Sequence, residues 1–405
     1  MTFSFDLAGL PEGFADDPYP IYRRLREEAP VHPQANGSFI LSRHADLDAV
    51  YRDTHRFISD KKAVFGPKYG VESPLFEHHT TSLVFNDPPL HTRVRSIMVG
   101  AMNPKALARM RPGLVALVDR LLDALAERQG PVDLVEDFAA AIPIEVIGNL
   151  FDIPHSQRGP LREWSLAILG ALEPNLSDAD MARGNRAVSE FKEFLRELVE
   201  ERRCWPGEIE TDVLTRLMQP GEGGLSEVEL LQNCIFILNA GHETTSNLIG
   251  NAIAILADRP QLREALLREE DLLPSAVDEF LRFESPNQFG NRLTSETVEI
   301  AGVTIPAGRD LHLCIGAANR DEAKFPDADM FIPDRHPNRH LAFGGGAHTC
   351  VGLSLARMEG RIAIGRFLRR FPDFRLTRPP ERSRRIRFRS LLSLHAELGP
   401  DFASI

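Results

Sequence analysis

Residues 343–352 form the stretch of this sequence best suited to chemistry. They read FGGGAHTCVG, so Cys350 comes shortly after a run of three glycines and just before Gly352. Glycine lets a backbone adopt unusual torsion angles and approach another molecule closely. The residues that follow have helical spacing, and the positive end of a helix dipole favours a thiolate at the helix entrance. An isolated cysteine is more often a small buried hydrophobic residue, but this setting favours Cys350 as a metal ligand.

A second candidate for chemistry lies in residues 240–245, where Glu243 and Thr244 interrupt an apolar stretch. The small residues Ala240 and Gly241 would let a flat ligand approach the backbone. A threonine inside a helix can bond an upstream carbonyl group and locally open the helix. Glu243 and Thr244 could then pass protons through water molecules. The alternative is that Glu243 is a buried carboxylate with a purely structural role.

A long helix must carry this second candidate. Ser226 and Glu229 form a capping-box pattern, and the apolar run after them continues to Ala257. The run is about 32 residues, or roughly 48 Å, long enough to cross a globular domain. A membrane span is the alternative, but polar residues interrupt the run too often for one. These residues are Asn233, Asn239, His242, Glu243, Asn247 and Asn251. We therefore predict a core helix of a large soluble fold.

Helical periodicity dominates the rest of the chain, for example in residues 114–128 and 185–203. Strand-like runs are few and short, at residues 37–42, 298–300 and 310–315. No internal repeat or Gly/Ser-rich linker divides the sequence. We expect one domain over residues 1–405 that is mainly α-helical with small β-sheets.

Composition and charge narrow the class of protein. The formal net charge of −11 argues against nucleic-acid binding, which requires Lys and Arg clustered over a large surface. The first residues lack a secretory signal, and the four scattered cysteines have no CxxC spacing, so we expect a cytoplasmic protein without a membrane anchor. Residues 88–118 and 335–358 contain basic but no acidic side chains. They predict a docking surface for an acidic partner, although chance clustering on exposed helices gives the same pattern.

The cysteine segment resembles the haem-binding pattern F-x-x-G-x-x-x-C-x-G of the cytochrome P450 family. Every fixed position matches, and the matching residues are Phe343, Gly346, Cys350 and Gly352. The resemblance implies the fold of that family, in which a long central helix lies over a haem. It also implies that the Cys350 thiolate binds the iron of haem b and donates electron density that favours O–O cleavage. Residues 240–245 resemble the family's oxygen-activation segment, which implies a proton relay through Glu243 and Thr244.

The resemblance also implies how the haem is held. The two propionates need cationic or hydrogen-bonding partners. The positions that match the family's propionate contacts are His91, Arg95, Arg292 and His348. The remaining cofactor contacts implied by the resemblance are Ala240, Phe343, Gly344 and Gly352.

Glu279 and Arg282 resemble the family's structural E-x-x-R pair, and we expect Arg335 to complete their ion-pair network. The motif is weak by itself, because residues 193–196 and 200–203 have the same spacing. Only the position upstream of the cysteine segment selects Glu279 and Arg282.

The activity implied by the resemblance is insertion of one oxygen atom from O2 into a small organic substrate, as hydroxylation or O-dealkylation. The sequence has no flavin, nicotinamide or iron–sulfur motif, so a ferredoxin and its reductase are expected to supply electrons to a monomeric enzyme without a fused reductase. Donor contacts are expected at Arg93, Lys105, Arg109 and Arg357. The alternatives are a peroxygenase, which does not call for the proton relay, and a non-catalytic haem sensor or carrier.

By family position, the substrate pocket is expected to be lined by residues 61–85, 164–176, 287–291 and 392–393. Large parts of these segments are apolar, which predicts a mostly hydrophobic substrate. Candidate anchors for a carboxylate are Lys61, Lys62, Lys68, His78 and His79, although such residues in exposed loops more often face water. The family often has a glycine where this chain has Arg389-Ser390-Leu391, so we expect that turn to differ in shape.

Overall fold

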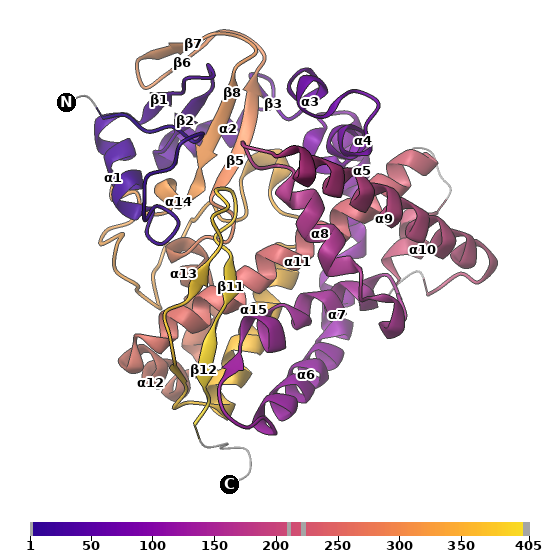
Figure 1. Ribbon diagram of the computed structural model, residues 1–405, viewed down its shortest axis with the longest axis vertical. Coiled ribbons are helices and arrows are strands. Elements are labelled where there is room, and N and C mark those ends of the chain that lie inside the picture. Colours follow the sequence, from indigo (N-terminus) through magenta and orange to yellow (C-terminus); the bar gives the residue numbers. More distant parts are fainter. Residues whose placement is uncertain (1–2, 209–211, 220–223, 400–405) are drawn as a thin grey trace. The chain divides into compact units, whose positions relative to one another are not determined.

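The structure is a computed structural model that describes residues 3–208, 212–219 and 224–399 (Figure 1). The chain divides into two compact units. We call residues 1–57, 113–142 and 244–405 the sheet unit, and residues 58–112 and 143–243 the helical unit. Three helices contribute residues to both units, namely α6 (Pro104–Ala126), α7 (Ala141–Leu150) and α11 (Glu227–Ala257).

The sheet unit contains a five-stranded sheet with the order β1-β2-β8-β5-β3. Its strands are β1 (Val31–Pro33), β2 (Phe39–Leu41), β8 (Asp310–Cys314), β5 (Phe289–Thr294) and β3 (Phe57–Ile58). Strand β2 runs parallel to β8, and β5 runs antiparallel to β8 with Phe289 opposite Cys314. Buried residues such as Leu41, Leu311 and Leu313 form the core around this sheet. The expected strands within residues 37–42 and 310–315 are thus confirmed.

The smaller sheets of this unit include its C-terminal residues. Strand β12 (His395–Glu397) pairs with β4 (Val132–Asp133) and β9 (Arg375–Leu376), and β10 (Glu381–Arg382) pairs with β11 (Leu391–Ser393). Strands β6 (Val298–Ile300) and β7 (Val303–Ile305) form a separate hairpin. The helices of the unit are α1 (Tyr19–Glu28), α2 (His44–Arg52), α12 (Pro260–Arg268), α13 (Leu273–Phe283), α14 (Ile315–Ala318) and α15 (Leu353–Arg370). Helices α13 and α15 pack against each other.

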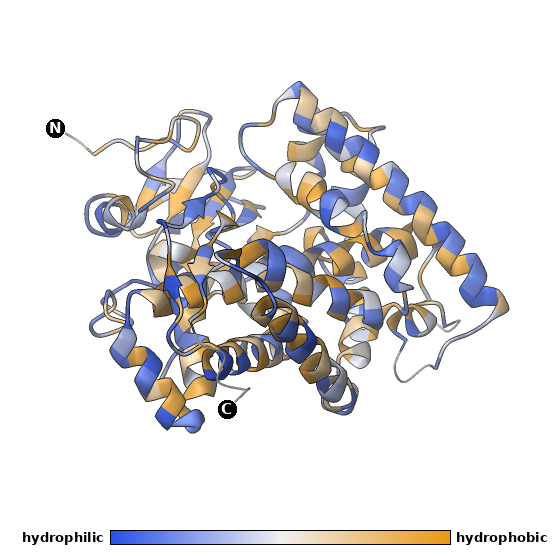
Figure 2. Cartoon of the chain, turned by 60° about the horizontal axis from the view of Figure 1, so that its bottom comes forward, coloured by the Kyte–Doolittle hydropathy of each residue, from blue (hydrophilic) through white to orange (hydrophobic). Residues whose placement is uncertain are grey.

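The helical unit has no strand of its own among its described residues beyond the end of β3. Its helices are α3 (Lys62–Tyr69), α4 (Pro74–Thr81), α5 (Leu90–Ala101), α8 (Leu161–Gly170), α9 (Asp178–Cys204) and α10 (Val213–Leu217). Helix α9 packs against α8 and α4. At the first contact, the ring of Trp164 lies 4.8 Å from that of Phe191. Hydrophilic and hydrophobic residues alternate along the long helices, which gives each an apolar face for this packing (Figure 2).

Helix α11 begins as its capping box predicts. The backbone N–H of Ser226 donates to Glu229 Oε2 at 2.8 Å, and the Glu229 N–H donates to Ser226 Oγ at 3.3 Å. The helix then continues without a break for 31 residues. In the described part of the chain, no helix has the length and apolar character needed to cross a membrane.

Candidate functional site

Cys350 lies in a tight loop of the sheet unit, just before α15. Its backbone N–H donates to the carbonyl oxygen of Phe343 at 2.9 Å, which closes the loop. Gly344 and Gly346 have φ angles of 66° and 62°, in the left-handed region that favours glycine. A Cβ atom on Gly346 would also collide with the carbonyl oxygen of Tyr51, so no larger residue fits there. The glycines thus determine the shape of the loop and leave the Cys350 side chain only half-buried.

Tyr51 of α2 is a supporting residue that sequence reasoning missed. Its Cβ atom would lie 3.1 Å from a Cβ on Gly345, and its hydroxyl would collide with a Cβ on Gly290 in β5. The guanidinium carbon of Arg292 lies 5.3 Å from the centre of the Tyr51 ring. Tyr51 therefore packs between the cysteine loop and the strand that carries Arg292. No motif marks it, and only the small size of these glycines hints that something large packs there.

Phe343 packs against two residues that both contact Asp278. We call the four residues the Asp278 cluster, which comprises Asp278, His340, Phe343 and Arg357. The Phe343 ring lies 5.7 Å from the His340 ring and 4.9 Å from the guanidinium carbon of Arg357. Asp278 Oδ1 accepts from Arg357 Nε at 2.7 Å and lies 3.3 Å from His340 Nε2. Burial alone would raise the pKa of Asp278, but hydrogen bonds from His340 and Arg357 outweigh burial and lower this pKa. The cluster joins α13 and α15 to the loop that closes on Cys350.

The E-x-x-R pair lies next to this cluster in sequence and is fully buried. Arg282 donates from Nε and Nη2 to the two carboxylate oxygens of Glu279, both at 2.7 Å. Arg335 Nε donates to Glu279 Oε1 at 3.1 Å, which confirms the expected network. The pairs at residues 193–196 and 200–203, which share the spacing, are exposed ion pairs on α9. Burial therefore separates the structural pair from the chance matches.

The residues expected at the propionates occupy both units. In the sheet unit, Arg292 is buried on β5, and His348 ends a short 3₁₀ turn in the cysteine loop. In the helical unit, His91 and Arg95 lie one turn apart near the start of α5, and His91 is buried. Their joint role stays a prediction.

The middle of α11 places Glu243 in a buried position. A Cβ atom on the preceding Gly241 would stand 2.5 Å from Ile147 Cδ1 of α7, so the helix backbone approaches its neighbour closely there. His242 lies between Gly241 and Glu243 in sequence. Burial lowers the pKa of His242 to about 4, the positive charge of Arg162 lowers this pKa further, and the His242 side chain is therefore neutral. Helix α11 is continuous through Thr244, so the local opening considered from the sequence is not seen. The small side chains of Ala240 and Gly241 permit a ligand to approach the backbone without a local opening of the helix.

The proposed carboxylate anchors are more constrained than the sequence indicated. Lys61, His78 and His79 are buried and not exposed. His78 Nδ1 lies 2.8 Å from Gln232 Oε1, and burial lowers the pKa of His78 to about 4, so it is neutral at physiological pH. Lys68 Nζ donates to the carbonyl oxygen of Glu173 at 2.8 Å. A neutral His78 is a poor partner for a carboxylate.

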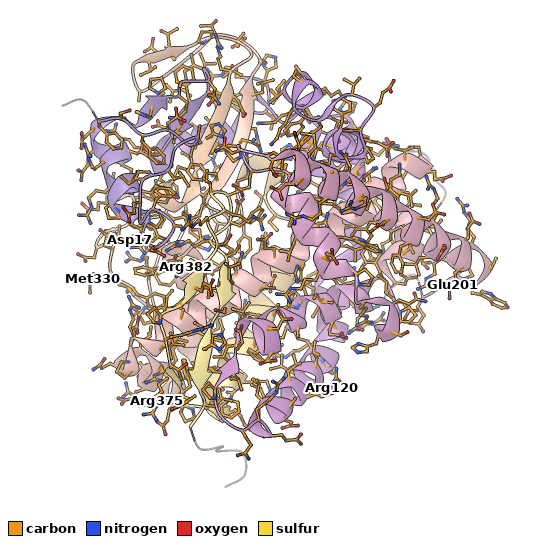
Figure 3. The ribbon with its side chains drawn as sticks, in the orientation of Figure 1. Asp17, Arg120, Glu201, Met330, Arg375 and Arg382 are labelled. Carbon is orange, nitrogen blue, oxygen red and sulfur yellow. The ribbon has the colours of Figure 1, made fainter. Side chains whose placement is uncertain are left out.

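The segment Arg389-Ser390-Leu391 is held by contacts of the Arg389 side chain and backbone. The buried Arg389 forms an ion pair with Glu284 and donates to the backbone carbonyls of Ala15 and Asp16. Asn251 of α11 donates to the Arg389 carbonyl at 3.0 Å and accepts from Arg382, a residue labelled in Figure 3. Beyond the turn, Leu392 is 58% exposed, whereas Ser393 is buried. The ion pair of Arg389 with Glu284 and the hydrogen bond from Asn251 thus hold this segment.

The residues of the cysteine loop fit a haem. A half-buried thiol stands at the entrance of an 18-residue helix, and the loop before it contains two glycines with positive φ angles. These are the properties that a haem-thiolate ligand requires, because the sulfur must reach the iron while the loop lies close to the macrocycle. Gly352 directly precedes the helix.

Comparisons with known proteins agree with this geometry. Residues 169–396 match the cytochrome P450 family model. Cytochrome P450 107B1 of Saccharopolyspora erythraea is 37% identical, with 93% of each chain covered. The biotin biosynthesis cytochrome P450 of Bacillus subtilis is 34% identical over 90% of this chain and 91% of that protein. The crystal structure of P450BioI in complex with hexadec-9Z-enoic acid ligated acyl carrier protein is 30% identical, covers 96% of this chain and 100% of that one, and gives a TM-score of 0.90. The chain belongs to the cytochrome P450 family and is a haem-thiolate monooxygenase with haem b as its cofactor.

Proposed function

We propose that Cys350 is the thiolate ligand of the haem in this monooxygenase and that the substrate is a small, mostly apolar organic molecule. The observation that carries the assignment is the glycine loop that presents the half-buried Cys350 at the start of α15. When bound, the haem supplies the activation of O2 and the transfer of one oxygen atom. The protein positions the substrate and controls the delivery of protons.

The remaining site residues divide between proton delivery and haem binding. Glu243 and Thr244 are proposed to deliver protons from α11, and the burial of Glu243 supports a role away from bulk water. His91, Arg95, Arg292 and His348 are proposed to hold the propionates through charge-assisted hydrogen bonds. The proposed contacts with the face and edge of the macrocycle are Ala240, Phe343, Gly344 and Gly352.

The named activities of relatives support a mostly apolar organic substrate. Vitamin D(3) 25-hydroxylase of Pseudonocardia autotrophica and 6-deoxyerythronolide B hydroxylase of Saccharopolyspora erythraea are each 34% identical to this chain. A solved structure of CYP109E1 from Bacillus megaterium in complex with testosterone has a TM-score of 0.87. The compounds in these names have different carbon skeletons. They therefore support the apolar character of the substrate but do not indicate one particular compound.

A separate ferredoxin with its reductase is the proposed electron source for a monomeric, cytoplasmic enzyme. Two of the expected donor contacts also form ion pairs within the chain. Arg93 pairs with Glu229, and Arg357 pairs with Asp278. Lys105 and Arg109 are exposed on α6, where they can contribute to the attraction for an acidic donor.

A carbon monoxide spectrum tests the ligand assignment. Wild-type protein should show the red-shifted Soret band that thiolate ligation gives to reduced, carbon monoxide-bound haem. Cys350→Ser should lose that band, whereas Cys204→Ser, which changes an exposed cysteine on α9, should keep it. A normal band in Cys350→Ser would refute the assignment.

Turnover distinguishes the candidate activities. Substrate oxidation with NADPH, ferredoxin and ferredoxin reductase supports the monooxygenase, and oxidation supported only by peroxide would indicate a peroxygenase. Glu243→Gln should slow the reductase-supported reaction and affect a peroxide-supported reaction less, because the latter does not call for the proton relay.

A further inference from the structure

Asn239, in the middle of α11, carries a hydrogen-bond donor that has no acceptor in the described part of the chain. Its side chain is 1% exposed, and its Oδ1 accepts a hydrogen bond from the hydroxyl of Ser165 in α8 at 2.8 Å. Its Nδ2 is buried and has no hydrogen-bond partner among the described residues. An unsatisfied buried donor costs roughly 1–3 kcal/mol, so such groups are rare in folded proteins and call for an explanation.

In other buried asparagines of the same helix, the side-chain N–H group has an acceptor, as in Asn247, which donates to Ser390 Oγ at 3.0 Å. Asn233 accepts from the Leu83 N–H at 2.9 Å and donates to the Glu229 carbonyl at 2.7 Å. Asn251 uses both ends of its amide in the same way, with Arg389 and Arg382 as partners. The side-chain donors of Asn233, Asn247 and Asn251 are thus satisfied, whereas that of Asn239 has no acceptor among the described residues.

The position of Asn239 relates its donor to the expected chemistry. Asn239 precedes Glu243 by four residues, so both side chains lie on one face of α11, one turn apart. Ser165 belongs to the segment that the family resemblance assigns to the substrate pocket. Around the pair, α11 and α8 supply buried apolar side chains such as Ile235 and Ile168. The donor is therefore a polar point within an apolar region beside the proposed proton relay.

We propose that the Asn239 side-chain N–H binds an acceptor oxygen of the substrate, such as a ketone, ester or ether oxygen, and that Ser165 fixes the orientation of the amide. This inference rests on the proposed function and narrows its substrate class to apolar molecules that carry an acceptor oxygen. A site that contains a buried hydrogen-bonding group rejects analogues without the matching group, because the polar group is then left unpaired. Asn239 is thus a specificity-determining residue.

Matched probe pairs test the proposal on the haem-loaded protein. One pair is 2-undecanone and 2-methyl-1-undecene, and the other is 4-phenylcyclohexanone and its 4-methylene analogue. Each pair differs only in the exchange of a carbonyl oxygen for a methylene group. Binding is followed by the shift of the Soret band of the ferric haem. In at least one pair, wild type should bind the ketone about fivefold to tenfold more tightly, as expected for one net hydrogen bond.

Three variants locate the effect. Asn239→Leu removes the donor and should bind both members of a pair equally. Asn239→Asp keeps the size but presents an acceptor, so it should also lose the preference for the ketone. Asn251→Leu, which changes a buried asparagine whose amide is satisfied, should retain it. Asn239→Leu also removes the acceptor of the buried Ser165 hydroxyl, so a lower unfolding temperature is expected for it, and the fold of each variant is checked by circular dichroism.

The outcomes separate this inference from the proposed function. Equal ketone and alkene affinities in wild type, or an unchanged ketone preference in both Asn239 variants, would overturn the role of Asn239. The carbon monoxide spectrum is recorded on the same samples. An intact thiolate-type band with equal affinities contradicts only the role of Asn239, whereas a wild type without that band contradicts the proposed function.

Discussion

Replacing Glu359 by glutamine should stabilise the protein progressively as the pH rises. Glu359 lies in α15, is 2% exposed, and its Oε2 has no hydrogen-bond partner among the described residues. Burial raises the pKa of this carboxyl from 4.5 to about 8. At neutral pH, Glu359 is therefore protonated in the native state and ionised in the unfolded chain. Folding takes up a proton at this position.

The size of the effect follows from the difference between the two pKa values. A rise from 4.5 to about 8 corresponds to roughly 4–5 kcal/mol at 1.36 kcal/mol per pKa unit. The stability that this group contributes is fully present below pH 4.5 and is lost as the pH rises to about 8. Glutamine has no proton to gain, so the variant lacks this dependence on pH.

Urea unfolding followed by far-UV circular dichroism measures the difference. The haem-loaded wild type and Glu359→Gln are compared between about pH 5 and pH 9, and the stability advantage of the variant should grow by about 3–5 kcal/mol across that range. Glu197→Gln, a change at an exposed glutamate of α9, is the matched control and should remain parallel to wild type. If the free energies of unfolding of wild type and Glu359→Gln change in parallel with pH, the inference that Glu359 is protonated in the native state at neutral pH is wrong.

Two further predictions concern the cysteine loop. Gly346→Ala should bind less than about a tenth of the wild-type haem, measured from the Soret absorbance per protein, because an added Cβ atom would collide with the Tyr51 carbonyl. Retention of full haem content would show that this position has no need of glycine for space or torsion. Asp278→Asn removes a negative charge from the Asp278 cluster and should shift the haem reduction potential to more positive values in a spectroelectrochemical titration. An unchanged potential would show that the cluster does not influence the iron.

Local sequence signals predicted the parts of the site that depend on local chemistry. The start of α11 followed from Ser226 and Glu229, which bond to each other across one turn. The cysteine loop followed from its glycines, two of which have positive φ angles. Such features are readable because a capping box or a left-handed glycine needs no distant partner.

Contacts between distant segments could not be predicted in the same way. Tyr51 supports the cysteine loop from a helix near the start of the chain, and no motif in its own segment indicates this. The expected role of Arg93 and Arg357 in docking overlooked their acidic partners, which lie far away in sequence. The burial of His78 was not predicted for a related reason, because it comes from tertiary packing.

Arg389 makes the two ends of the chain depend on each other. Its guanidinium takes two of its acceptors from the backbone of Ala15 and Asp16, ahead of α1, while its own carbonyl is held by Asn251 in the central helix. Trimming the first residues up to Asp17 to improve expression would therefore remove two acceptors of a buried cation 374 residues downstream of Ala15 and leave it the Glu284 carboxylate. The effect of changes to the first residues should therefore be measured on the stability of the hairpin formed by β10 and β11.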